Sequence, residues 1–108
     1  MIVKLKTKSI DFSDLSPKQQ YFVIGIEADD YRIINDHGKP YLYPQKMFEI
    51  INSNEPSDWV TEYGDDGERY SYPEILNRPG FFEDYFNGDP EAFSKFWQLI
   101  NSNLSRAA

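Results

Sequence analysis

Short runs of β-branched and aromatic residues recur along the first two thirds of this chain, and each run is bounded by residues that favour turns. The runs recur at intervals of about eight to twelve residues, which is the strand spacing of a β-barrel or sandwich and not of alternating βαβ units. We therefore predict that residues 1–72 form a small β-barrel or a curved antiparallel sheet.

The run YFVIGIEA at residues 21–28 is too apolar for a surface strand, so it is predicted to be central and buried. Gly25 within it indicates a bulge, a bend or a closely packed neighbour. The run IVKLKTKSI alternates apolar residues with lysines, which predicts a strand from Ile2 to Lys8 at a sheet edge that the lysines protect. Further strands are expected at residues 31–35, 41–44 and 46–52, and in a hairpin formed by 59–63 and 69–72.

The hydrophobic period changes near residue 80, where aromatic residues take up helical spacing. A first helix is predicted to stop at Gly88. Asp89, Pro90 and Glu91 then supply an N-cap, a proline at the first helical position and an acid in the first turn. Residues 80–104 are therefore expected to form two helices packed on the sheet, in a single domain over residues 1–108. The apolar face of the second helix is predicted to be core, formed by Ala92, Phe93, Phe96, Trp97, Ile100 and Leu104.

Length and composition limit the class of protein. The chain has 108 residues and no cysteine, so we expect one domain without disulfides or thiolate metal sites. No stretch approaches the roughly 20 apolar residues that cross a bilayer, and the N-terminus lacks an apolar signal core. A cytoplasmic protein without membrane contact is the expectation.

Acidic residues are clustered along the chain. The net charge is −7, yet residues 1–20 carry +2, whereas residues 55–91 carry eleven acids and two arginines. Such a field repels nucleic acid and anionic membranes and attracts cationic proteins. The alternative is a charge that serves only solubility. A nucleic-acid site on the N-terminal lysines is a weaker alternative, because stacking platforms also need a basic groove along the backbone.

The segment WVTEYGDDGERY, residues 59–70, holds the densest group of acids. Gly67 can be aligned with the invariant glycine at position 6 of a calcium-binding loop. In this alignment positions 3 and 12 of the loop carry no acid, which leaves a weak, adventitious divalent site as the alternative. The single histidine, His37, lies in a predicted exposed loop. The acids surround a predicted Asp-Gly hairpin turn, where solvent keeps carboxylates ionised. We therefore expect no catalytic, metal or cofactor residues and no enzymatic activity.

Several segments resemble a family of small bacterial immunity proteins. The segments are YFVIGIEADDYRIINDHGKPYLYPQKMFEIIN, PSDWV, GERYSYPE and PGFFEDYFNGDPEAFSKFW, within residues 20–98. Proteins of this family have an SH3-like barrel and occur beside polymorphic or contact-dependent growth-inhibition toxins. The resemblance implies a single-domain immunity protein that binds and blocks a cognate toxin, in many cases a nuclease with a basic cleft.

The acids and tyrosines would then form the contact surface, the acids through charge and the tyrosines through buried area. The alternative for each acid is an ordinary solvated position. A second hypothesis is an SH3-like adaptor that binds a basic peptide or protein tail in a groove of Tyr41, Tyr43 and Trp59. The predicted partner-binding residues are Asp29, Asp30, Glu62, Tyr63, Asp65, Asp66, Glu68, Tyr70, Tyr72, Glu83 and Asp84.

Overall fold

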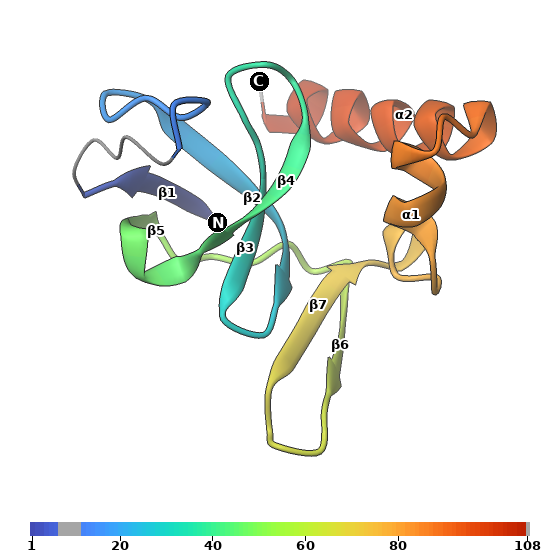
Figure 1. Cartoon of the computed structure of the whole chain (residues 1–108), viewed down its shortest axis with the longest axis horizontal. Coiled ribbons are helices and arrows are strands. Elements are labelled where there is room, and N and C mark those ends of the chain that lie inside the picture. Colours follow the sequence, from blue (N-terminus) through green and yellow to red (C-terminus); the bar gives the residue numbers. More distant parts are fainter. Residues whose placement is uncertain (7–11, 108) are drawn as a thin grey trace. The chain divides into compact units, whose positions relative to one another are not determined.

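The computed structural model describes residues 1–6 and 12–107 of the chain (Figure 1). The contacts within the chain divide it into two compact units, Met1–Pro73 and Glu74–Ala108. This boundary falls between the region predicted to form the sheet and the region predicted to form helices. Among the described residues, no helix is long and apolar enough to span a bilayer.

The first unit is an antiparallel sheet. Its strands are β1 (Ile2–Leu5), β2 (Gln20–Glu27), β3 (Asp30–Ile34), β4 (Pro40–Pro44), β5 (Phe48–Asn52), β6 (Trp59–Tyr63) and β7 (Arg69–Pro73), with a 3-10 turn at Gln45–Met47 between β4 and β5. Its pairing path runs β4-β3-β2-β1-β5, and the β6–β7 hairpin joins the sheet where β7 pairs with β2. Among the described residues no pairing joins β4 to β5, so the sheet is open. The predicted mainly β, α+β class is confirmed, as an open bent sheet rather than a closed barrel.

Strand β2 is the centre of this sheet, as its apolar sequence predicts. It pairs with β1 over Gln20–Phe22, with β3 from Val23 to Glu27 and with β7 at its end. The register with β3 shifts between Val23 and Gly25, which is the bulge that Gly25 indicates. Gly25 also lies against the ring of Tyr72, because a Cβ built on this glycine would come within 2.7 Å of the Tyr72 Cζ.

The position of the first strand differs from the predicted one at a sheet edge. β1 pairs with β2 on one side and with β5 on the other, so it is an interior strand and not an edge protected by lysines. Lysine alternation marks a strand with one solvated face, and an interior strand of an open sheet has such a face too. Thr7 and Lys8, which were expected to continue this strand, lie outside the described residues.

The second unit is helical. It contains a 3-10 turn at Glu74–Leu76, a short helix α1 (Phe81–Phe86) and a long helix α2 (Pro90–Ala107). Gly88 follows α1 with a φ of +84°, and the Asp89 carboxylate accepts a hydrogen bond of 3.2 Å from the Glu91 N–H. The predicted stop and N-cap are therefore confirmed.

Three of the six residues predicted to form the apolar face of α2 are buried, and a fourth, Trp97, is half-buried. Ala92, Phe96 and Ile100 are buried, and Phe96 contacts the ring of Tyr85 edge-on at 5.1 Å. Phe93 departs from the prediction, because its side chain is 53 % exposed while it stacks on Tyr85. The side chain of Leu104 lies outside the described part of the chain.

Hydroxyl groups connect the start of β2 and the segment before it to the β3–β4 hairpin. The Tyr21 hydroxyl donates to Asp36 Oδ1 at 2.6 Å, and Ser16 Oγ donates to the other oxygen of the same carboxylate at 2.6 Å. The Tyr43 hydroxyl donates to Asp14 Oδ2, also at 2.6 Å. Both tyrosine side chains are largely buried, so these bonds give their hydroxyls partners within the fold.

This network predicts a loss of stability at alkaline pH. Burial, together with the hydrogen bond to Asp36, raises the pKa of Tyr21 to about 12 from the usual 10.0. A group whose pKa is raised by folding stabilises the fold fully below its unfolded pKa, and this contribution is lost as the pH rises through the folded value. We expect the urea midpoint, measured by circular dichroism at a series of pH values, to fall between pH 10 and 12.

The control for this prediction is Tyr21→Phe, which removes the ionisable hydroxyl and keeps the ring. This variant should be less stable than the unaltered chain at neutral pH and should lose less stability on going to high pH. An identical dependence on pH in both proteins would contradict the role of Tyr21.

Candidate functional site

The β6–β7 hairpin carries most of the predicted contact residues. We call residues 59–70 the acidic arm. Only Tyr70 and Ser71 of β7 pair with β2, whereas β6 and β7 pair with each other along their whole length. The end of the hairpin that carries the turn therefore extends away from the other strands of the first unit (Figure 1). An isolated two-stranded hairpin is marginally stable, so its anchoring on β2 matters for the position of the acids.

The turn of the arm fixes where two of the acids lie. The Gly64 N–H donates to the Glu68 carbonyl at 2.8 Å, and the Gly67 N–H donates to the Gly64 carbonyl at 3.0 Å. Gly67 has a φ of +80°, whereas Asp65 and Asp66 have negative φ values. This is a three-residue loop built on a type I turn and closed by a left-handed glycine. The predicted hairpin is confirmed, and Asp65 and Asp66 are exposed at its tip.

Glu68 differs from the other acids of the arm. Its carboxylate accepts a hydrogen bond of 3.0 Å from the Asp66 N–H and lies over Gly64, where a Cβ would overlap it. The side chain therefore stabilises the turn. Glu68 contributes charge to the arm, but a substitution there would also change the loop.

The arm contains one basic residue, Arg69, and Glu55 already binds it. Arg69 Nη1 donates to Glu55 Oε2 at 2.8 Å, a second contact joins Nη2 to Glu55 Oε1, and Arg69 Nε donates to Ser71 Oγ. The hydrogen bond from Arg69 holds the pKa of Glu55 below its usual value. Within the described residues, the acids of the arm itself form no ion pair: Glu62, Asp65, Asp66 and Glu68.

Two further predicted acids lie beside the arm, although they are distant in sequence. Asp29 is in the tight β2–β3 turn and Asp30 begins β3. The Ala28 N–H of this turn donates to the Arg69 carbonyl at 2.8 Å. Ala28 has a φ of +52°, which is costly for a residue with a Cβ, and Gln45 holds the turn through the carbonyls of Ala28 and Asp29. The structure therefore places Asp29 and Asp30 next to the base of the acidic arm.

The three predicted tyrosines have different surroundings. Tyr63 is 71 % exposed on β6, and Tyr70 is half-buried. Tyr72 is buried at 5 % exposure, so its ring is enclosed and not displayed at the surface. Position along β7 explains the difference between Tyr72 and the exposed tip, because β7 pairs with β2 at Tyr70 and Ser71 and Tyr72 lies beyond this point, away from the turn.

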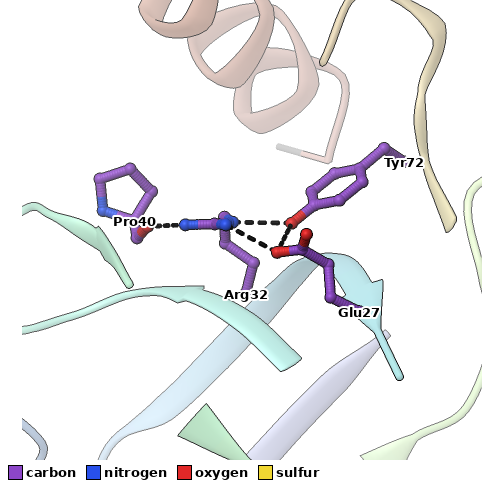
Figure 2. A network of polar contacts seen from close by, with 4 residues as sticks. All are labelled: Glu27, Arg32, Pro40 and Tyr72. Carbon is purple, nitrogen blue, oxygen red and sulfur yellow. Dashed lines mark hydrogen bonds and ion pairs between the residues drawn. The ribbon is translucent and has the colours of Figure 1, made fainter. Parts of the chain in front are cut away.

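Tyr72 belongs to a buried polar network that the sequence interpretation did not include (Figure 2). Arg32 is the centre of this network: its Nε donates to the Tyr72 hydroxyl, its Nη1 to the Pro40 carbonyl and its Nη2 to Glu27 Oε2, each at 2.7 Å. The Tyr72 hydroxyl donates to the same Glu27 oxygen at 2.9 Å. Burial raises the pKa of Tyr72. The only sequence signal for this network was an arginine within the apolar run YRIIN.

The remaining predicted residues, Glu83 and Asp84, belong to α1 in the helical unit. Asp84 forms an ion pair of 2.9 Å with Arg78, which offsets part of its charge, while Glu83 is exposed. They are thus not part of the arm, and Asp84, unlike the acids of the arm, is in an ion pair.

The rings expected for a peptide groove do not share one surface. Tyr43 is 2 % exposed and its hydroxyl is bound to Asp14, while Trp59 is half-buried and packs on the core of the first unit. Tyr41 is exposed. His37 is exposed in the β3–β4 loop, as predicted. In the described part of the chain, no three side chains of His, Asp or Glu come together in an arrangement that could hold a metal ion.

Comparisons with known proteins found no protein-family model, no curated protein and no solved structure that matches the chain.

Proposed function

We propose that this chain is a non-enzymatic immunity protein that binds and neutralises a cognate bacterial toxin domain in the cytoplasm. The toxin is proposed to be a nuclease with a basic cleft, and the contact surface consists of the acidic arm and the adjoining β2–β3 turn. The proposal rests on the sequence resemblance described above and on the charge of this surface.

One observation carries the proposal. The acidic arm presents four carboxylates without an ion pair, because its one arginine is already bound by Glu55. Exposed acids of one sign on a projecting hairpin attract a basic protein and speed its encounter. Tyr63, at 71 % exposure beside these acids, supplies a ring that a partner can bury.

This surface could act on a nuclease by competition. A nuclease cleft binds phosphates through lysine and arginine side chains, and carboxylates on a narrow hairpin can occupy the same cations. The β2–β3 turn would widen the contact beside the arm. No bond has to be made or broken in this mechanism, so the protein acts only by occupying the cleft.

The test is charge reversal on the arm. We expect Glu62→Lys, Asp65→Lys and Asp66→Lys together to weaken binding to the toxin encoded beside this gene by about a hundredfold, mainly through slower association. Glu68 is left unchanged because its carboxylate stabilises the turn. Binding would be measured by surface plasmon resonance over a range of salt concentrations, together with protection of toxin-expressing cells.

A matched control reverses three exposed acids elsewhere: Glu49→Lys, Glu74→Lys and Glu91→Lys. It changes the net charge by the same amount and should retain most of the affinity. Equal weakening by both triple variants would show that net charge and not the arm governs binding. Unchanged affinity and unchanged salt dependence in the arm variant would rule out this surface.

A further inference from the structure

The outer edge of β6 is open. Among the described residues β6 pairs only with β7, so one side of its backbone has no partner strand. We propose that this edge binds an extended, lysine- or arginine-rich strand of the partner by β-sheet addition. This inference rests on the proposed function and specifies how the acidic arm would engage its partner.

The register of the hairpin identifies the backbone groups that are available. The bond from the Gly64 N–H to the Glu68 carbonyl closes the hairpin, and antiparallel pairs alternate between bonded and non-bonded positions from there. Glu62 and Val60 therefore point their N–H and C=O groups toward β7, opposite Tyr70 and Tyr72. The alternate positions of β6, Thr61 and Tyr63, direct theirs outward.

The edge lacks the features that usually block strand addition. Proteins protect open edges with proline, lysine or a bulge, and β4 follows this rule with a proline at each end. The sequence of β6, WVTEY, contains neither proline nor lysine and is rich in residues that favour strands. The pairing of β6 with β7 also has no register shift.

Charge selects the occupant of this edge. Glu62 lies on the strand and Asp65 and Asp66 follow it, so a basic side chain on an added strand would face opposite charge across the pair. A second copy of the chain would bring two acidic arms together, which like charges disfavour. The open edge of β5 suits a basic strand less well, because β5 pairs with β1, which contributes Lys4 opposite Glu49.

The test uses the unaltered chain and two capped synthetic peptides in which lysine alternates with valine. The second peptide carries N-methyl groups at alternate residues, which block the hydrogen-bonding edge and keep the charge. At low ionic strength the first peptide should bind and slow amide hydrogen exchange at Thr61 and Tyr63. The methylated peptide should bind about tenfold more weakly, the cost of one or two hydrogen bonds.

A pair of variants gives an independent check. Thr61→Pro removes an outward N–H and should weaken binding of the first peptide by about the same factor. The variant should still fold, because proline is tolerated where the N–H of an edge strand faces solvent. Thr61→Val is its control, because it loses the hydroxyl bond to Ser71 but keeps the N–H, and should bind normally. If Thr61→Pro unfolds the arm, the two peptides on the unaltered chain decide the question.

Three results would overturn the inference: equal binding of both peptides, binding of neither, or protection of β5 amides in place of those of β6. Self-association that Thr61→Pro abolishes would also overturn it, because a second copy would then occupy the edge. The proposed function can fail separately. In that case the peptides would still distinguish the edge, but reversal of Glu62, Asp65 and Asp66 would leave toxin binding unchanged.

Discussion

Replacement of Gly25 by alanine should lower the free energy of unfolding by about 2 to 3 kcal/mol, a large effect for the addition of one methyl group. Gly25 is buried in β2 at the bulge with β3, and a Cβ there would overlap the Tyr72 ring. The ring cannot move away easily, because its hydroxyl is held by Arg32 and Glu27. Denaturation by urea, followed by circular dichroism, measures the loss.

Two comparisons separate this overlap from other effects of alanine. Gly38→Ala is the backbone control: Gly38 has a φ of +75° and open space around a built Cβ, so only left-handed strain of about 1 kcal/mol is expected. In a Tyr72→Leu background, where the ring is absent, Gly25→Ala should cost much less than in the unaltered chain. A loss of equal size in both backgrounds would contradict the proposed overlap.

Removal of the Glu27 carboxylate should be the second severe change. Glu27→Ala is expected to lower the free energy of unfolding by about 2 to 3 kcal/mol, because the Arg32 side chain is only 8 % exposed and loses the carboxylate that pairs with it. Glu27 itself is 33 % exposed, which keeps the expected cost below that of a fully buried pair. Glu27→Gln retains hydrogen-bond acceptors and should be intermediate. Urea denaturation again measures the change.

The matched control for Glu27 is an exposed ion pair in the same molecule. Glu91 and Lys95 pair at 2.8 Å one turn apart on the surface of α2, and Glu91→Ala should change stability very little because solvent screens such pairs. If Glu27→Ala proved no more destabilising than Glu91→Ala, the buried network would not contribute to stability as the geometry suggests.

The parts of the fold that sequence could predict depend on local rules. Gly88 and Asp89 mark the end of α1 and the start of α2, since a left-handed glycine and a carboxylate cap act within a few residues. The β6–β7 hairpin is equally local, because its turn residues are adjacent. The apolar run of β2 indicates a central strand, since it is buried on both faces through much of its length.

The errors and omissions concern contacts between distant segments. Lysine alternation gives β1 a solvated face, but it does not say that β5 pairs on its other side. Arg32 and Tyr72 are 40 residues apart, so no local pattern indicates that they share a hydrogen bond. Phe93 has the spacing of a core residue, yet its side chain is exposed, because spacing along a helix does not show which of its turns another segment covers.

For the candidate site, too, the sequence predicts local features but not contacts between distant segments. Asp65 and Asp66 could be placed at an exposed turn from the Asp-Gly signal alone. The approach of the β2–β3 turn to Arg69 depends on the pairing of β2 with β7, which the sequence does not reveal. Whether Arg69 neutralises the arm also required the structure, because its partner Glu55 lies outside the hairpin.

The most direct test is an NMR titration of the isotope-labelled chain with the toxin domain that we propose as its partner. We predict that the backbone amides of Asp29, Tyr63, Asp65 and Asp66 show the largest chemical-shift changes, and that at a fixed toxin concentration these changes become smaller as salt is added. Shifts confined to α1 and α2, or shifts at the arm that salt does not weaken, would contradict the claim that the acidic arm is the binding surface.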